Sequence, residues 1–356
     1  MKKIGREVCF LKYNENISRN GEGAFIRLDD GKIMYAYTEY GKTCYDNDEA
    51  RICAIFSSDE GETWGEKRIL VEKENDDVNI MSVSLLRMAN GDVGLFFLRK
   101  RSTSCLLNLV RSSDNCKTFS DAIICNGDPN DEHYYVVNND RVITLKSGRI
   151  IYPANLHPFK TKKDISDISP KGIQLFYGSD DDGITWKRLS DEIRNPFPNI
   201  SSGLQEGGVF EHDNGEIFGW SRTKAGSQFT MYSSDGGETW TSPCASEVFT
   251  SPDSPMQVKN VGKYTVAIFN PIPMYTSRVH TGTWGRTPFI CAVSTDNGRT
   301  FDKFYSIEDD LTNGYCYPAI FEGEDYFLVA YYHSDNTGFC LKSAKITKIM
   351  FSELEE

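Results

Sequence analysis

An all-β fold of six similar sheets is predicted by three features of the sequence. An octet of the form S-x-D-x-G-x-T-W recurs along the chain, a turn glycine flanked by apolar segments precedes each octet, and the units repeat about every 60 residues. A unit of this length is the size of a four-stranded blade, and 356 residues hold six of them. The repetition predicts a six-bladed β-propeller that occupies residues 1–356 as a single domain.

The octet is a predicted hairpin clip. Its aspartate can accept hydrogen bonds from backbone N–H groups across a tight turn, and its glycine supplies a positive φ. The terminal aromatic side chain can pack beneath the turn. Four copies fit the pattern, one of them with Phe301 in place of the final Trp, and a weaker one has Cys116 in the glycine position; in chain order the five span residues 57–64, 112–119, 179–186, 233–240 and 294–301. We expect these octets to be structural rather than catalytic.

Polar residues recur nine positions before the turn glycines of five units. The turn glycines are Gly31, Gly91, Gly148, Gly215 and Gly262. The residues nine positions before them are Glu22, Ser82, Asn139, Glu206 and Asp253. Because the first strand of each blade lines the channel of a propeller, equivalent positions converge there. A ligand site is therefore expected at the centre of the ring.

The sixth unit has two apolar strands, residues 319–321 and 326–332, but no octet. The last apolar segment, residues 339–349, and the first, residues 8–11, are expected to complete this blade together. Such a pairing of the two ends would close the ring.

Charge and motif content argue against several classes of function. The 39 Lys and Arg residues are outnumbered by 51 Asp and Glu, giving a net charge of −12, and an acidic surface repels nucleic acid and anionic membranes. No nucleotide-binding loop or zinc-ligand spacing is found, so no cofactor or metal is expected. The ten cysteines lack CxxC pairs, and the N-terminus lacks the apolar core of a signal peptide. Reduced, buried thiols and a cytoplasmic location are predicted, with a processed secreted form as the alternative.

Five octets in six units resemble the sialidase (neuraminidase) superfamily, whose members are six-bladed β-propellers with Asp-box (BNR) repeats. The resemblance extends over essentially the whole chain. It implies a retaining exo-glycosidase for a terminal acidic sugar, with a tyrosine nucleophile, a glutamate that takes its proton, an aspartate acid/base and three arginines around the substrate carboxylate. The glutamate is needed because a phenol, with an unperturbed pKa near 10, is a poor nucleophile at neutral pH. The expected partner is a carbohydrate substrate, and the sequence carries no signal of oligomeric state.

The resemblance places four of these roles in the second half of the chain. Glu206 precedes a strand, an Asp-Asn-Gly turn and a strand that ends at Arg222, similar to the glutamate and second arginine of the family. Arg286 precedes the strand into the fifth octet, where the third arginine falls. Tyr317 stands at the start of the last blade, where the nucleophile is expected, with Tyr315 as the alternative on the same strand face.

The acid/base aspartate of the family lies in a loop of the first blade. The corresponding loop here is CYDNDE, residues 44–49. Asp48 fits the position best, with Asp46 and Glu49 as the alternatives.

The first arginine of the family has no counterpart, because Glu22 occupies its position. A carboxylate there repels an anionic ligand and removes a bidentate ion pair, at a cost of several kcal/mol. Side chains that could compensate, or could select a different sugar, are Arg19, Arg99, Lys100, Arg141 and His157. The substitution leaves two alternatives open: a propeller hydrolase or lyase for glycans that contain uronic acids, and a noncatalytic glycan-binding propeller.

Overall fold

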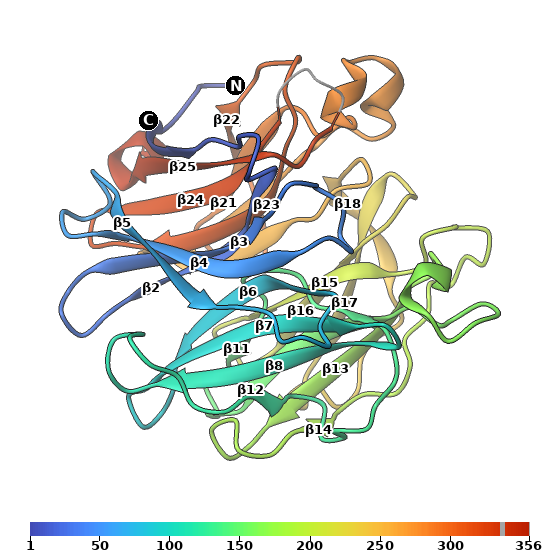
Figure 1. Cartoon of the computed structure of the whole chain (residues 1–356). Coiled ribbons are helices and arrows are strands. Elements are labelled where there is room, and N and C mark those ends of the chain that lie inside the picture. Colours follow the sequence, from blue (N-terminus) through green and yellow to red (C-terminus); the bar gives the residue numbers. More distant parts are fainter. Residues whose placement is uncertain (335–338, 356) are drawn as a thin grey trace.

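The structure is a computed structural model that describes residues 1–334 and 339–355. It shows six antiparallel sheets, or blades, around a common centre (Figure 1). The predicted six-bladed propeller is confirmed. In the described part of the chain, no helix is both long enough and apolar enough to cross a membrane.

Blades 1, 2 and 4 are four-stranded sheets whose strands follow one another in the sequence. Blade 1 comprises β2 (Arg19–Arg27), β3 (Ile33–Tyr40), β4 (Ala50–Ser57) and β5 (Gly65–Val71). Blade 2 comprises β6 (Asn79–Arg87), β7 (Val93–Arg101), β8 (Ser104–Ser112) and β9 (Ile123–Ile124). Blade 4 comprises β15 (Gln205–Glu211), β16 (Ile217–Arg222), β17 (Ser227–Ser233) and β18 (Cys244–Thr250).

Blade 5 follows the same order, whereas the inner strand of blade 3 is divided. Blade 5 comprises β19 (Gln257–Val261), β20 (Tyr264–Phe269), β21 (Phe289–Ser294) and β22 (Lys303–Glu308), with the short 3₁₀ helices η2 (Tyr275–Ser277) and η3 (Thr281–Thr283) between β20 and β21. Blade 3 comprises β10 (Tyr135–Val136), β11 (Ile143–Thr144), β12 (Ile150–Leu156), β13 (Ile173–Ser179) and β14 (Lys187–Arg188), with η1 (Ile165–Asp167) before β13. Both β10 and β11 pair with β12, so residues 137–142 interrupt the inner edge of blade 3.

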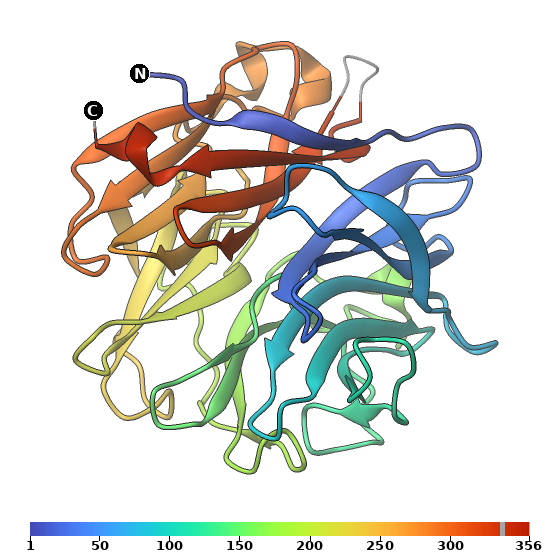
Figure 2. The ribbon, with the colours of Figure 1, turned by 90° about the vertical axis from the view of Figure 1, so that its left-hand side faces the viewer.

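Blade 6 joins the two ends of the chain. It comprises β23 (Tyr315–Glu322), β24 (Tyr326–His333), β25 (Ser343–Met350) and β1 (Arg6–Leu11), and the 3₁₀ helix η4 (Phe351–Leu354) follows β25. The blue N-terminal strand runs beside the red C-terminal one (Figure 2), and β1 pairs antiparallel with β25. The expected closure of the ring is confirmed, although β25 begins at Ser343 and residue 339 lies outside it.

The first strand of each blade is the innermost, as predicted. Strand β2 contacts β6 and β23, and β19 contacts β15 and β23, so these strands line the centre of the ring. Apolar side chains fill the spaces between blades; Ile52 of blade 1 and Phe97 of blade 2, for example, are fully buried in one cluster. Burying apolar area between blades stabilises each blade against its neighbours and gives the channel a rigid wall.

The octets form the predicted clips. In the first copy, Ser57 Oγ donates to Asp59 Oδ1 (2.8 Å), and Asp59 accepts from the Thr63 backbone N–H (2.9 Å) and hydroxyl (2.6 Å). The same bonds recur around Asp114, Asp181, Asp235 and Asp296. In the weak copy, Cys116 adopts the positive φ (59°) that glycine takes elsewhere.

The ten cysteines are free thiols and seven are buried, whereas Cys244 is exposed, contrary to expectation.

Replacing the clip aspartate should destabilise its blade. Asp296→Ala removes the acceptor for Ser294 and Thr300, and we expect the free energy of unfolding to fall by about 1–2 kcal/mol at pH 7. The hydrogen bond from Ser294, followed by those from Thr300, lowers the pKa of Asp296 to about 2. The contribution is therefore complete above about pH 4 and disappears as the pH falls toward 2.

Urea unfolding of wild type and variant across this pH range measures the effect. Arg299→Ala is the matched control, because its exposed side chain forms a 3.6 Å ion pair with Glu216 and should contribute less than about 0.5 kcal/mol. Equal unfolding free energies for wild type and Asp296→Ala would contradict the role of the clip.

Candidate active site

Four innermost strands carry a β-bulge at equivalent positions. The bulged residues have φ between 44° and 59°, where the pairing register shifts, and they are Glu22, Ser82, Glu206 and Tyr317. A left-handed conformation costs a residue with a side chain on the order of 1–3 kcal/mol, so neighbouring groups must hold each bulge. A bulge re-aims a side chain away from the regular alternation of the strand. Residues from different blades can thereby meet across the centre of the ring.

Tyr317 and Glu206 meet in this way. Tyr317 Oη donates to Glu206 Oε1 over 2.6 Å, and the other oxygen of Glu206 accepts from Arg222 Nη1 over 2.6 Å. Arg222 Nε also donates to Asp253 Oδ1 over 2.6 Å. The structure therefore joins four residues singled out in the sequence, from blades 4 and 6 and from the segment before β19, into one hydrogen-bonded chain.

The phenol of Tyr317 is protonated at neutral pH. Its burial in the site raises the pKa of Tyr317 well above the ordinary value, Glu206 adds to the rise, and Arg222 and Arg286 oppose it. Glu206 accepts the phenolic hydrogen bond and is therefore placed to take the proton. Tyr315 has a different environment: its ring packs against Phe289 and His333. The expectation that Tyr315 and Tyr317 share a strand face is wrong, because the bulge turns Tyr317 toward the centre.

Arg286 lies beside this pair and is 3% exposed. Its Nε and Nη2 donate to the backbone carbonyl of Asp253 at 3.2 and 3.1 Å, and its Nη1 lies 3.1 Å from Cys316 Sγ. Its guanidinium lies 5.5 Å from the centre of the Tyr317 ring. Within residues 1–334 and 339–355 no carboxylate pairs with Arg286, whereas Arg222 carries two. Arg286 is thus the cation at the site most able to receive an anionic group.

Asp46, and not Asp48, reaches the site. The carboxylate of Asp48 accepts from the backbone N–H of Tyr45 (2.9 Å) and closes the turn, while Glu49 pairs with Lys73 at 3.4 Å. Asp46 accepts from Arg19 Nη1 over 2.5 Å. Asp46 therefore lines the central cavity and Asp48, the residue favoured from the sequence, does not, because turn geometry directs the side chain of Asp48 back to its own loop.

The carboxyl group of Asp46 is open to water yet held by cations. Its side chain is 62% exposed, and the buried Lys100 donates to its backbone carbonyl over 2.7 Å. The loss of water around its carboxyl group raises the pKa of Asp46. The positive charges of Arg19 and then Lys100 lower this pKa by more, so it lies below the ordinary value.

Arg19 is the cation that stands next to Glu22. Both side chains are buried, and they form a close ion pair. Ser82 Oγ donates to Glu22 Oε2 over 2.7 Å, Tyr332 Oη accepts from Arg19 Nε over 2.7 Å, and the Arg19 guanidinium lies 4.3 Å from the Tyr40 ring centre. The charge of Glu22 is therefore neutralised inside the protein, and Arg19 is committed to Glu22 and Asp46.

Of the other binding residues proposed from the sequence, most lie outside the central cavity. Arg99 pairs with Glu74 at 2.8 Å and does not line the central cavity. Arg141 and Asn139 are buried beneath the site and also do not line it. His157 does line it: its Nδ1 lies 2.8 Å from the Ser169 carbonyl, and burial lowers the pKa of His157. This histidine is neutral at pH 7, so it offers the site no positive charge.

The central cavity has a volume of about 370 Å³. One part of its wall is charged and carries Asp46, Glu206, Arg222 and Arg286, with Tyr317 among them. The other part is largely aromatic and aliphatic and consists of Tyr45, Tyr134, Val136, Ile168, Trp284, Phe339 and Leu341. Sequence reasoning missed this second part, although Tyr45 next to Asp46 and Trp284 close to Arg286 were available signals. A cavity lined by both charged and aromatic side chains suits a sugar ring that carries an acid group.

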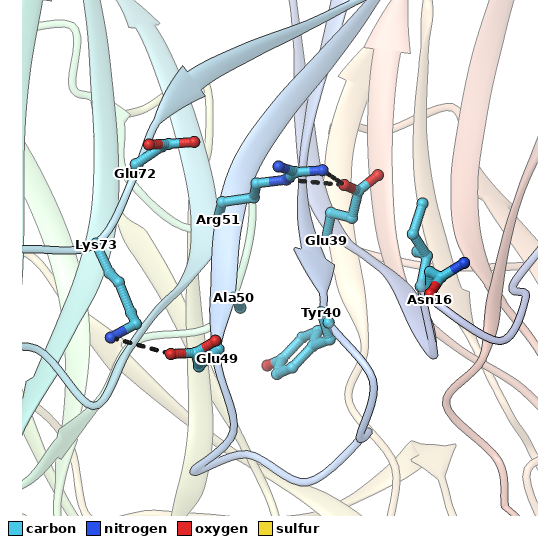
Figure 3. A pocket seen from close by; sticks show the side chains of 10 residues that line it. Asn16, Glu39, Tyr40, Glu49, Ala50, Arg51, Glu72 and Lys73 are labelled. Carbon is cyan, nitrogen blue, oxygen red and sulfur yellow. Dashed lines mark hydrogen bonds and ion pairs between the residues drawn. The ribbon is translucent and has the colours of Figure 1, made fainter.

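A second hollow of about 310 Å³ lies on blade 1 (Figure 3). Its charged side chains pair with one another: Arg51 donates to Glu39 over 2.6 and 2.9 Å, and Lys73 pairs with Glu49 (Figure 3). These contacts leave no catalytic constellation in the hollow. The central cavity, where Tyr317 contacts Glu206, is the stronger candidate site.

Comparison with known proteins agrees with this architecture. The BNR repeat-like domain family matches residues 31–330. Among curated protein sequences, none matches this chain. Similar solved structures include a protein of unknown function from Dyadobacter fermentans, which is 17% identical with a TM-score of 0.73 over 97% of this chain and 99% of that one.

Sialidases are also among the similar structures. The NanB sialidase of Streptococcus pneumoniae is 12% identical with a TM-score of 0.71, over 98% of this chain and 71% of that chain. The intramolecular trans-sialidase of Ruminococcus gnavus is 14% identical with a TM-score of 0.72, over 94% and 95% of the two chains. At such identities the likeness establishes a common fold. The chain belongs to the BNR repeat-like domain family, and its six-bladed propeller is the fold of the sialidases.

Proposed function

We propose that this protein is a sialidase-like retaining exo-glycosidase that acts on a terminal acidic sugar such as sialic acid. The observation that carries the proposal is the 2.6 Å hydrogen bond from Tyr317 to Glu206 in a cavity that also holds Arg286, which pairs with no carboxylate of residues 1–334 and 339–355. A tyrosine paired with a base is an activated nucleophile. The same contact argues against a noncatalytic glycan-binding role, for which no such pair is needed.

In the first step, Tyr317 Oη attacks the anomeric carbon while Glu206 takes the phenolic proton. The bond from the anomeric carbon to the leaving oxygen breaks, and Asp46 gives that oxygen a proton. A neutral tyrosine avoids bringing another carboxylate toward an anionic substrate. Arg286, joined by the remaining donor capacity of Arg222, binds the acid group of the sugar.

In the second step, water replaces the tyrosine on the anomeric carbon. Asp46, now ionised, accepts a proton from the water, and Glu206 returns its proton to Tyr317 Oη. Two displacements on opposite faces restore the original anomeric configuration, which makes the proposed enzyme retaining.

Tyr317→Phe should abolish turnover while the fold survives. The variant lacks only the attacking oxygen, and we expect kcat on an aryl α-sialoside to fall by about 10³-fold or more. Release of the phenol measures turnover, and thermal unfolding checks the fold. Tyr315→Phe is the matched control on the same strand, because Tyr315 faces the blade interior and its variant should keep activity within about twofold. Full activity in Tyr317→Phe would refute the assignment of the nucleophile.

The pH dependence should report Asp46. A general acid works only when protonated, and the positive charges of Arg19 and Lys100 hold the pKa of Asp46 below its ordinary value. We therefore expect kcat/KM to be highest at acidic pH and to fall as the pH rises through the pKa of Asp46. Asp46→Asn should remove this alkaline limb and slow substrates with poor leaving groups more than aryl glycosides.

Asp48→Asn is the comparison variant for this experiment, since Asp48 closes its own turn. A pH profile altered by Asp48→Asn but not by Asp46→Asn would return the acid/base role to Asp48.

A second candidate is a hydrolase or lyase for glycans that contain uronic acids. The observation that favours it is the buried Glu22–Arg19 pair in the place of the first arginine of the sialidases. With Arg222 already shared between Glu206 and Asp253, the acid group of a ligand meets fewer free cations. Turnover of a uronide combined with inactivity on every α-sialoside would favour this candidate over the first.

A further inference from the structure

Three consecutive residues of blade 3, residues 139–141, occupy the centre of the ring where β10 and β11 are interrupted. We name this group the channel segment. Its residues are Asn139, Asp140 and Arg141, which are 0%, 8% and 1% exposed, and Asp140 has a φ of 56°. Buried polar groups need partners, and those of the channel segment come from all five other blades.

The amide of Asn139 reaches two bulges at once. Its Nδ2 donates to the carbonyl of Gly23, directly after Glu22, over 2.9 Å. The same nitrogen lies 3.4 Å from the carbonyl of Tyr317 itself. One side chain of blade 3 therefore holds the bulges of blades 1 and 6.

Asp140 links the segment to blades 2, 5 and 6. Its backbone N–H donates to the carbonyl of Val83, which follows Ser82. Its carboxylate accepts from the Ile320 backbone N–H (3.1 Å), close to Tyr317 on β23, and from Gln257 Nε2 (3.0 Å). This carboxylate supports β23 where the register is broken.

Arg141 holds the bulge of blade 4. Its Nε donates to the carbonyl of Gly207, directly after Glu206, over 3.1 Å, and its Nη2 donates to the carbonyl of Met256 over 2.5 Å. Asn155 accepts from the N–H of the same Gly207 over 2.8 Å, so this residue is fixed from both sides. Arg141 forms no ion pair within the described residues, although a buried cation is costly. Its partners are backbone carbonyls, which indicates a geometric role.

We propose that the channel segment positions the catalytic pair: Asn139 and Asp140 set the Tyr317 bulge, and Arg141 sets the Glu206 bulge. The identification of the pair as catalytic rests on the proposed function, whereas its geometry does not. Blade 5 separates the blades that carry Tyr317 and Glu206. The inner strand of blade 5, β19, has no such bulge. The channel segment contacts the strands of both residues and can therefore fix their positions relative to each other.

Arg141→Met and Asn139→Ala test the proposal, and Arg141→Lys is a milder variant that keeps the charge but cannot reach both carbonyls in the same fork. Arg149→Met is the matched control: Arg149 also belongs to blade 3 and donates to a carbonyl of blade 4, that of Gly236, but at the outer turns. Crystal structures give the Tyr317–Glu206 distance, and kinetics on an acidic aryl glycoside give kcat and KM separately.

We expect the channel-segment variants to lengthen the Tyr317–Glu206 contact beyond hydrogen-bond distance and to lower kcat by about 100-fold, with KM changed by less than about threefold. Arg149→Met should keep both the contact and kcat. A retained contact with kcat within about twofold in Arg141→Lys and Asn139→Ala would overturn the proposal. Global unfolding of both, with Arg149→Met folded, would also overturn it by showing a general stabilising role. A separated pair in the variants, with no turnover by wild type, would support the positioning role and reject the proposed function.

Discussion

The β-bulge at positive φ is the constraint on which the site depends. In a regular strand, Tyr317 would share the face of Tyr315 and lie against the blade interior, and Glu206 would follow the same alternation. One extra residue in each inner strand turns these side chains to the centre of the ring. The conformation is unfavourable in itself, and it persists because the polar contacts of Asn139, Asp140 and Arg141 and the packing between blades fix the inner strands.

Electrostatic pairing then decides what the cavity can bind. Arg19 and Arg222 are each held between two carboxylates, so most of the positive charge is already matched inside the protein. Arg286, by contrast, has carbonyl and thiol partners among the described residues. The guanidinium of Arg286 lies 5.2 Å from the ring centre of Trp284, so a cation and an aromatic face adjoin in the same cavity.

The candidate residues that the structure brings together are those that hold a fixed place in the repeat. Glu206, Arg222 and Tyr317 could be placed because each occupies a fixed position relative to a turn or strand. Asp46 could not be separated from Asp48, because within a loop three carboxylates in four residues are equivalent until the turn is known. Arg141 was expected at a ligand-binding wall; its contacts with carbonyls of two other blades depend on tertiary structure and leave no sequence pattern.

The pairing of β1 with β25 has a consequence for the order of assembly. Strand β1 is synthesised long before its partner β25, so blade 6 cannot be completed until β25 has been made. Tyr317 belongs to that same blade, whereas Glu206 is synthesised more than a hundred residues earlier. A nascent chain that has passed Glu206 still lacks Tyr317, so the hydrogen bond between the two residues can form only after β23 has been made.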